Sequence, residues 1–335
     1  MSQMFTEAIL LLLSLLIILA GAEVFTNSVE WLGKKLNMGD GAVGSIFAAV
    51  GTALPETIIP VIAIVWGGPE GGRDVGIGAI LGAPFMLATL AMCVTGIAAL
   101  VKRKNNTPMD TVPGVMKRDI RFFMLVFSVA VLASFLPVRP LKLVVAGFLV
   151  CAYAYYVYRA LKSSGGGYDE DGESLRPLYM MRKSPNPPSG LVALQLAIAL
   201  GVIIAGANLF VDSVQFVAAY FGAPVLILSL IITPFATELP EKFNSIIWVM
   251  RSRDTLALGN ITGAMVFQSS VIPALGILLT EWKLEPIALI SAFLAFAAIL
   301  YQYTGIAGRK GLRPSHLLSG GLFYIAFIVC VAILG

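Results

Sequence analysis

Two short segments of the chain place a glutamate and a proline inside long apolar runs. The first is 51–56 (GTALPE), within about residues 42–66, and the second is 236–241 (ATELPE), within about residues 224–250. A carboxylate deep in a segment of membrane-spanning length costs several kcal/mol unless it is paired or functional. Each proline lacks a backbone N–H, so the carbonyl oxygen four residues earlier loses its intrahelical donor. The segments therefore predict oxygen ligands gathered at membrane depth.

Threonine and glutamate occur at the same spacing in both segments. Each threonine precedes the final glutamate by four residues, so the two side chains share a helix face. If the two kinked helices cross antiparallel at their breaks, both pairs converge with the carbonyls freed by the prolines. The predicted ligands are Gly51, Thr52, Glu56, Ala236, Thr237 and Glu241. An all-oxygen set with two negative charges suits a hard divalent cation, calcium first, and no nearby His or Cys favours zinc or copper.

Further polar residues flank the second segment. Glu238 and Lys242 are spaced i,i+4 and should pair in a low dielectric. Lys242 is then either a tethered cation that leaves Glu56 and Glu241 as the net site charge, or part of a structural ion pair. Gln268 is the clearest polar side chain deep in its own apolar run. It is expected to be a ligand or ligand support, with an interhelical hydrogen bond as the alternative.

Two more acids are candidates for gating or for ion access. Glu23 and Asp212 lie near the ends of the first and sixth apolar runs, and local pairing is the alternative for both. Glycine pairs in the third and eighth runs should allow close approach to the second and seventh runs. A proline follows each pair and is expected to break its helix further along. These residues are Gly78, Gly82, Pro84, Gly259, Gly263 and Pro273.

The overall composition is that of a polytopic membrane protein. Of 335 residues, 58% are hydrophobic and 13% are charged, and the mean hydropathy is +0.88, whereas soluble domains carry about 25% charged residues. The lipid bilayer is therefore the expected partner, with no required protein partner. Basic residues sit in short loops rather than in a patch, which argues against nucleic-acid binding. No cofactor motif appears, and no Ser/His, zinc-ligand or paired-Asp signature supports an intramembrane enzyme.

The apolar runs predict an all-α fold with ten transmembrane helices. Lysine and arginine concentrate in alternate loops, beginning with the loop after the first run. This bias predicts that those loops are cytoplasmic and that both termini are extracytoplasmic in a plasma or inner membrane. The expected spans are about 6–31, 42–66, 74–101, 119–136, 141–161, 190–219, 224–250, 255–280, 285–304 and 315–334.

An internal repeat divides the chain. A shift of 185 residues aligns 20–29 with 205–214 and, without a gap, the two acidic segments with each other. Five spans per half is an odd number, so the halves should be inverted repeats. The expected units are a first five-helix repeat at 1–161, a flexible cytoplasmic linker at 162–189 and a second repeat at 190–335. The acidic cluster 169–173 in the linker is expected to be solvated, with a calcium sensor as the alternative.

These motifs resemble those of the calcium/cation antiporter superfamily, specifically its sodium/calcium exchanger branch. The resemblance rests on 51–56, on 237–241 and on Gly259-Asn260-Ile261-Thr262-Gly263-Ala264, and it covers essentially the whole chain. It implies an antiporter in which spans two, three, seven and eight hold the ions. It also implies that spans one and six slide as the gate.

The chain departs from the family pattern at several positions. Alanines stand at Ala83 and Ala264, where the family usually has serine, and Leu87 and Gln268 stand at a later site position. Glu238 takes the place of another serine. We expect an antiporter that exchanges Ca²⁺ or a similar hard cation for Na⁺ or H⁺ by alternating access. An antiporter for another cation (Na⁺/H⁺ or Mg²⁺/Mn²⁺ type) and an ion channel are the alternatives.

Overall fold

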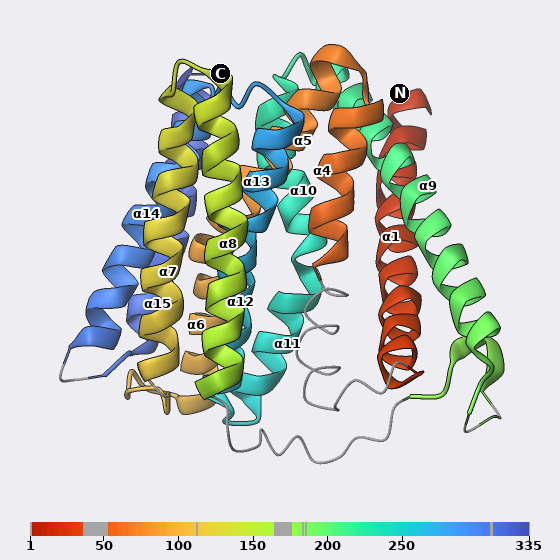
Figure 1. Ribbon diagram of the computed structural model, residues 1–335. Helices are drawn as coiled ribbons and strands as arrows, with labels where there is room; N and C mark the ends of the chain where they lie inside the picture. Colours follow the sequence, from red (N-terminus) through yellow and green to blue (C-terminus); the bar gives the residue numbers. More distant parts are fainter. Residues whose placement is uncertain are drawn as a thin grey trace.

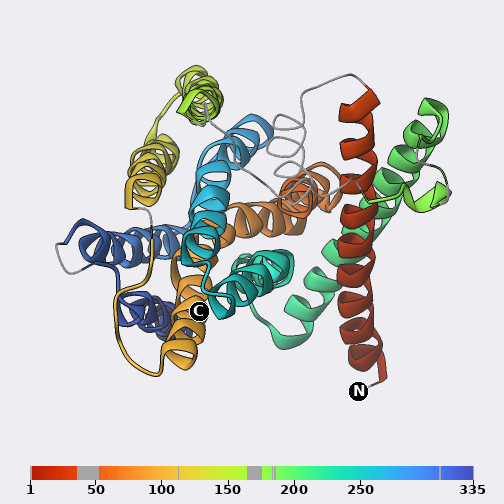
Figure 2. The same cartoon turned by 90° about the horizontal axis from the view of Figure 1, so that it is seen from below.

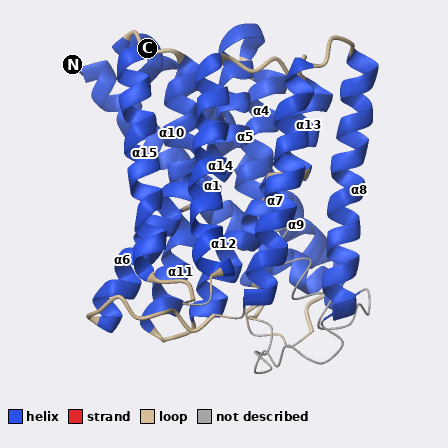
Figure 3. Ribbon diagram, turned by 90° about the vertical axis from the view of Figure 1, so that its left-hand side faces the viewer, coloured by secondary structure: helices blue, strands red, loops and turns tan. Residues whose placement is uncertain are grey.

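The computed structural model describes residues 2–35, 53–111, 113–163, 176–182, 184, 186–308 and 311–334, and these residues form helices and no strands. The α-helices are α1 (Ser2–Lys35), α4 (Leu54–Trp66), α5 (Arg73–Met86), α6 (Met92–Arg103), α7 (Pro113–Leu132), α8 (Arg139–Ser163), α9 (Ser189–Phe221), α10 (Val225–Thr237), α11 (Leu239–Met250), α12 (Asp254–Gln268), α13 (Val271–Leu279), α14 (Pro286–Ala307) and α15 (Pro314–Leu334). Short π-helices η2 (Gly68–Gly72) and η3 (Leu87–Ala91) and 3₁₀-helices η4 (Ala133–Phe135) and η5 (Tyr179–Met181) connect them. Figure 3 shows the resulting all-helical bundle.

Seven helical stretches of the described chain are long and apolar enough to cross a membrane. They correspond to seven of the ten predicted spans: Met4–Lys35, Arg73–Arg103, Arg139–Ala160, Ser189–Phe221, Asp254–Leu279, Pro286–Ala307 and Pro314–Ile333. The second and seventh predicted spans contain the shorter apolar helices Leu54–Trp66 and Val225–Phe235. The fourth corresponds to α7, whose first half carries several charged residues, Asp119 among them.

The helices form a main bundle with one long helix pair at its side. α1 and α9 pack along each other and contact the bundle through α4 (Figures 1 and 2). α5 occupies the centre, where it contacts both α4 and α10. α1 begins and α15 ends at one face of the bundle, whereas α8 ends and α9 begins at the opposite face (Figure 1). α5, most of whose residues are buried, is therefore enclosed by other helices, and the long pair lies at the side of the bundle.

Glycines let α5 lie very close to its neighbours. A Cβ at Gly78 would lie 2.7 Å from Ser229 Cβ, and one at Gly82 would lie 2.5 Å from Pro234 Cγ. The predicted close approach of these glycines is thus confirmed for α10, the first part of the seventh span. Gly259 and Gly263 have no described atom within 4 Å of a built Cβ.

The predicted break at Pro84 is wrong. Pro84 lies inside α5, and the helix continues through η3 into α6 as one stretch from Arg73 to Arg103. A π-turn lets the chain absorb a missing backbone hydrogen bond without ending the helix. In the second half, α12 does end, at Gln268, and α13 begins at Val271 with Pro273 in its first turn. The predicted interruption near Pro273 therefore lies just before that proline.

The exposed surface of the bundle is apolar. Large side chains such as Phe5 (70% exposed), Leu322 (70%) and Ile333 (75%) face outward, whereas small residues and polar groups are buried between helices. Lipid removes the hydrophobic drive for helix association, so membrane helices pack through small residues and internal hydrogen bonds instead. The distribution is that of a protein solvated by lipid.

Candidate functional site

The two Leu-Pro-Glu segments begin helices in the same way. Ala53, which precedes α4, has φ −85° and ψ 4°, and Glu238, which precedes α11, has φ −83° and ψ 3°. Each residue's carbonyl accepts a bond from the amide four residues on, at 3.2 Å from Thr57 and 3.1 Å from Lys242. The proline is the second residue of each helix, where a missing N–H is harmless. The following glutamate lies in the first turn, where the helix dipole favours a negative charge.

The structure describes part of the predicted ligand set. Glu56 is 5% exposed and Thr237 is 2% exposed, so both are buried in the bundle. Gly51 and Thr52 lie outside the described residues. Ala236 and Glu241 belong to α10 and α11, but their side chains are not among those described. The predicted convergence of all six ligands is therefore still a prediction.

Glu238 and Gln268 are brought together across helices. Gln268 Nε2 donates to Glu238 Oε1 at 2.5 Å, which joins the end of α12 to the break between α10 and α11. Both side chains are buried, at 0% and 2% exposure. Gln268 Oε1 is buried as well, and no described residue donates to it. The amide thus supports the carboxylate and also presents an oxygen for which the described residues supply no donor.

The Lys242 ammonium lies at the same break. Its Nζ donates to the carbonyl oxygens of Pro234 at 3.4 Å and Phe235 at 3.5 Å, and it lies 5.4 Å from the centre of the Phe235 ring. The residue is 6% exposed. The ammonium group of Lys242 therefore lies on the backbone carbonyl oxygens at the end of α10. The expected ion pair with Glu238 stays a prediction.

The two halves meet near these breaks. α4 and α10 contact each other and share one hydrophobic cluster, to which Leu54 and Ile58 contribute from α4 and Leu228 and Ile232 from α10. Within the described part of the chain, no group of three His, Cys, Asp or Glu side chains is placed to hold a metal ion.

Glu23 and Asp212 lie away from this region. Glu23 is exposed on α1, where it accepts bonds from Tyr179 Oη at 2.8 Å and Arg176 Nη1 at 3.1 Å. The hydrogen bond to Glu23 is the largest of the effects that raise the pKa of Tyr179, followed by burial and the Glu23 charge. Asp212 is exposed on α9. Local pairing, the alternative considered for Glu23, is what the structure shows.

Sequence reasoning missed a polar cluster that ties α1 and α9 to residues 176–182. Gln195 Nε2 donates to Asn27 Oδ1 at 3.1 Å and to Ser28 Oγ at 2.8 Å, and its Oε1 accepts from the Met180 amide at 2.8 Å. The Tyr179 amide donates to Asn27 Oδ1 at 3.2 Å. Gln195 is 1% exposed. Its position in a long apolar run was the available signal.

A buried acid on α7 was also missed. Asp119 is 2% exposed and accepts bonds from Tyr156 Oη at 2.6 Å, Thr262 Oγ1 at 2.9 Å and Arg118 Nε at 3.3 Å. The carboxylate thereby joins α7, α8 and α12. Its neighbours satisfy both oxygens, so this acid holds helices together. An acid at the start of an apolar run was the signal for it.

Basic residues at the face of the chain termini hold the turn after α13. Arg139 donates to the carbonyls of Ile277, Leu278 and Thr280, and Lys142 donates to those of Glu281 and Trp282. Cations at a helix C-terminus satisfy its free carbonyls. These contacts give two basic residues of that face a structural role.

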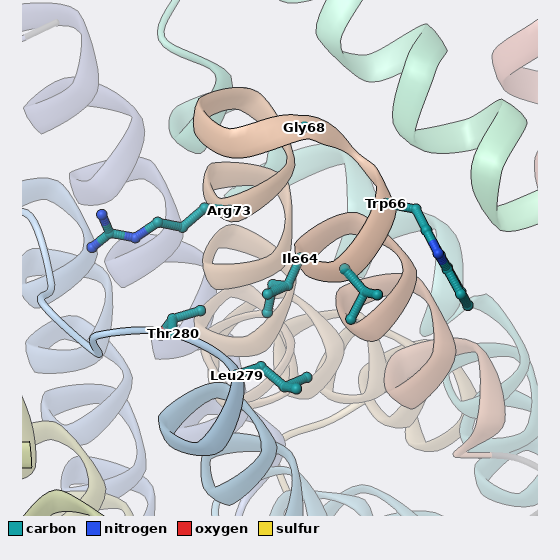
Figure 4. Close-up of a pocket in the computed structure, with 7 residues that line it drawn as sticks. Ile64, Trp66, Gly68, Arg73, Leu279 and Thr280 are labelled. Atoms are coloured by element: carbon teal, nitrogen blue, oxygen red, sulfur yellow. The ribbon is translucent and has the colours of Figure 1, made fainter.

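A hollow of about 450 Å³ lies beside this turn, at the ends of α4 and α13 (Figure 4). None of the predicted site residues lines it, and its charged side chain is basic. The lining residues are Ile64, Val65, Trp66, Gly68, Arg73, Leu279 and Thr280. The hollow therefore does not coincide with the predicted ligand set.

Comparisons with known proteins agree with this architecture. The chain is 24% identical to the putative antiporter CaxA of Alkalimonas amylolytica over 97% of each chain. It is 25% identical to the inner membrane protein YrbG of Escherichia coli (strain K12), over 97% of this chain and 95% of that protein. The crystal structure of an H⁺/Ca²⁺ exchanger, CAX, superposes with a TM-score of 0.72 at 18% identity, covering 98% of this chain and 85% of the other.

A family profile decides the classification. The profile described as sodium/calcium exchanger protein matches residues 6–162 and 191–335, which is nearly all of the chain outside the linker. The resemblance inferred from the two acidic segments is thereby confirmed, and the protein is a transporter rather than an enzyme. The chain is a membrane protein that belongs to the sodium/calcium exchanger family.

Proposed function

We propose that this chain is a secondary active antiporter that exchanges Ca²⁺ or a similar hard cation for Na⁺ or H⁺. One observation carries the proposal: two Leu-Pro-Glu helix starts with matching backbone angles, one in each half. The buried Glu56 of the first start and Glu241 of the second would supply the two negative charges. Carboxylates on two broken helices that face a shared site are the arrangement expected of an alternating-access transporter.

The proposed architecture has ten spans in two inverted five-helix repeats, 1–161 and 190–335, joined by the linker 162–189. Seven of these spans are the long apolar stretches. The other three would be a second span that contains α4, a fourth formed by α7 and a seventh formed by the α10–α11 pair. The long pair of α1 and α9 would move against the bundle as the gate. Its polar contacts with residues 176–182 support an attachment at the linker face. By the distribution of basic loops, that face is cytoplasmic and both termini are extracytoplasmic, in a plasma or inner membrane.

The coupling ion is proposed from the site chemistry. The second half carries Glu238 where the family usually has serine, and Gln268 donates to it. A serine hydroxyl that could bind sodium is absent at this position, which supports H⁺ as counter-ion with Glu56 or Glu241 as the proton carrier, while the family profile is named for sodium. The transport experiment therefore compares a Na⁺ gradient with an H⁺ gradient.

The test is uptake of radioactive Ca²⁺ by proteoliposomes of the purified chain under imposed Na⁺ and H⁺ gradients. We expect uptake under one gradient, and losses of at least about 100-fold in Glu56→Gln and Glu241→Gln, because each removes a charge that the transported cation needs. Lys283→Met, at an exposed loop, is the control and should transport normally. Uptake that survives both glutamine variants would refute the site, and single-channel currents would indicate a channel.

A further inference from the structure

We propose that Lys242 is a built-in cation of the transport site, which cancels the charge of Glu238 and sets the exchange at two monovalent cations per divalent cation. The inference rests on the proposed antiport. It concerns a feature that distinguishes the two halves of the chain. The first half has Ala53 and Thr57 where the second has Glu238 and Lys242.

Burial requires these two charges to be considered together. Glu238 is 0% exposed and Lys242 is 6% exposed, and the Lys242 amide donates to the Glu238 carbonyl, so the two lie one helical turn apart. A single buried charge is strongly unfavourable, whereas opposite charges close together compensate each other. One anion and one cation in the same turn add no net charge to the region.

The position of the ammonium group resembles that of a bound ion. Lys242 Nζ lies on the carbonyl oxygens of Pro234 and Phe235, at the break where α10 ends. Backbone carbonyls at helix breaks are the groups that coordinate ions inside membrane transporters. At the matching position of the first half, Thr57 places a neutral hydroxyl 2.7 Å from the Ala53 carbonyl. The second half therefore holds a permanent positive charge where the first has none.

The charge balance gives a specific stoichiometry. With Glu238 and Lys242 cancelling each other, Glu56 and Glu241 leave a net charge of minus two. One divalent cation or two monovalent cations neutralise it, so exchange moves no net charge across the membrane. Without the ammonium group the site has one more negative charge, and a third monovalent cation is required for each divalent cation.

The experiment measures Ca²⁺ uptake in proteoliposomes whose membrane potential is clamped with valinomycin and K⁺, using the counter-ion that drives the wild-type chain. Wild-type uptake should not depend on the potential. Uptake by Lys242→Met should become voltage-dependent, and its final Ca²⁺ ratio should change by about tenfold for a tenfold counter-ion gradient at zero potential, since one further ion is coupled. Removing both charges with Glu238→Gln plus Lys242→Met should restore voltage independence. Lys283→Met, which removes an exposed charge and its exposed ion pair with Glu281, should match the wild type.

Each outcome decides the matter. Voltage-independent exchange by Lys242→Met, or a double variant that behaves like the single variant, would overturn the inference. So would a current carried by the wild-type chain during exchange, a measurement that needs no variant and stands if Lys242→Met does not fold. Absence of gradient-driven Ca²⁺ uptake by the wild type refutes the antiport itself. That result differs from failure of the inference, in which uptake persists with the wrong charge balance.

Discussion

At the start of α4, positions 53 and 57 hold alanine and threonine, whereas the matching positions at the start of α11 hold Glu238 and Lys242. The backbone angles of the residues that precede the two helices agree within a few degrees. The shared Leu-Pro-Glu start dictates that geometry, because proline fixes its own φ and favours the first turn. The same backbone geometry can thus carry different side-chain charges, and at these positions the two halves differ in charge and not in backbone conformation.

The helices that support the breaks differ as well. Leu87 in the first half corresponds by the repeat to Gln268 in the second. At Leu87 a π-turn begins and the helix continues, and at Gln268 the helix ends. Six residues before these positions, Leu81 is buried in apolar surroundings, whereas its counterpart Thr262 donates to Asp119. At this pair of positions the second half therefore uses a polar contact where the first uses apolar packing.

The largest effect is expected from making the second break resemble the first. Glu238→Ala and Lys242→Thr should each destabilise the protein by about 3–5 kcal/mol, because each leaves an opposite charge buried. The double variant, which carries the residues of the first half, should lose much less than the sum. Equilibrium unfolding in detergent micelles measures this coupling, and additive losses would show that the two side chains do not pair.

A second difference to test is the polar support of α12. Asp119→Asn should cost about 1.5–3 kcal/mol, since three hydrogen bonds to a charged carboxylate are weakened. We expect the ion coupling ratio to stay unchanged, because Asp119 lies outside the proposed ligand set. Asp110→Asn, at an exposed side chain, is the matched control. A loss of transport without a loss of unfolding free energy would assign Asp119 to the site instead.

The apolar contact of α5 with α10 predicts a cost for one added methyl group. Gly82→Ala should destabilise the protein by about 1–3 kcal/mol, because its Cβ would lie 2.6 Å from the Leu230 carbonyl and 2.5 Å from Pro234. Gly201→Ala in α9, with no described atom within 4 Å, should be neutral or stabilising. Gly263→Ala, at the position that the repeat aligns with Gly82, should also cost little, because no described atom lies within 4 Å of the added Cβ. Equal effects at Gly82 and Gly201 would contradict the packing.

The smallest effect concerns the contacts between Glu23 of α1 and residues 176–182. Bonding to Glu23 raises the pKa of Tyr179, so the docked loop favours the neutral phenol. The stabilisation that the Tyr179–Glu23 hydrogen bond gives to this contact is complete below the ordinary tyrosine pKa of about 10. It is lost as pH rises through the raised pKa of Tyr179. A spin label at Met181→Cys, with the native cysteines replaced, should therefore gain mobility above pH 10. Tyr179→Phe should remove this pH dependence.

Much of the architecture could be predicted because apolar length and proline position act locally. The apolar runs predicted seven stretches that the structure confirms, and the Leu-Pro-Glu motifs predicted where helices begin. Pro84 was misjudged because the sequence does not show whether surrounding helices hold a chain together through a π-turn. Asp119 and Gln195 were missed because their partners lie 143 and 168 residues away in the chain.

The sequence alone determined the membrane class, the family motifs and the pairing of 51–56 with 236–241, since these depend on composition, spacing and internal repetition. The tertiary structure decided which polar side chains meet. It placed Gln268 on Glu238, Lys242 on the carbonyls of Pro234 and Phe235, and Tyr179 on Glu23. Such contacts depend on the relative orientation of helices that are distant in the chain. That orientation is set by the packing of all the helices together.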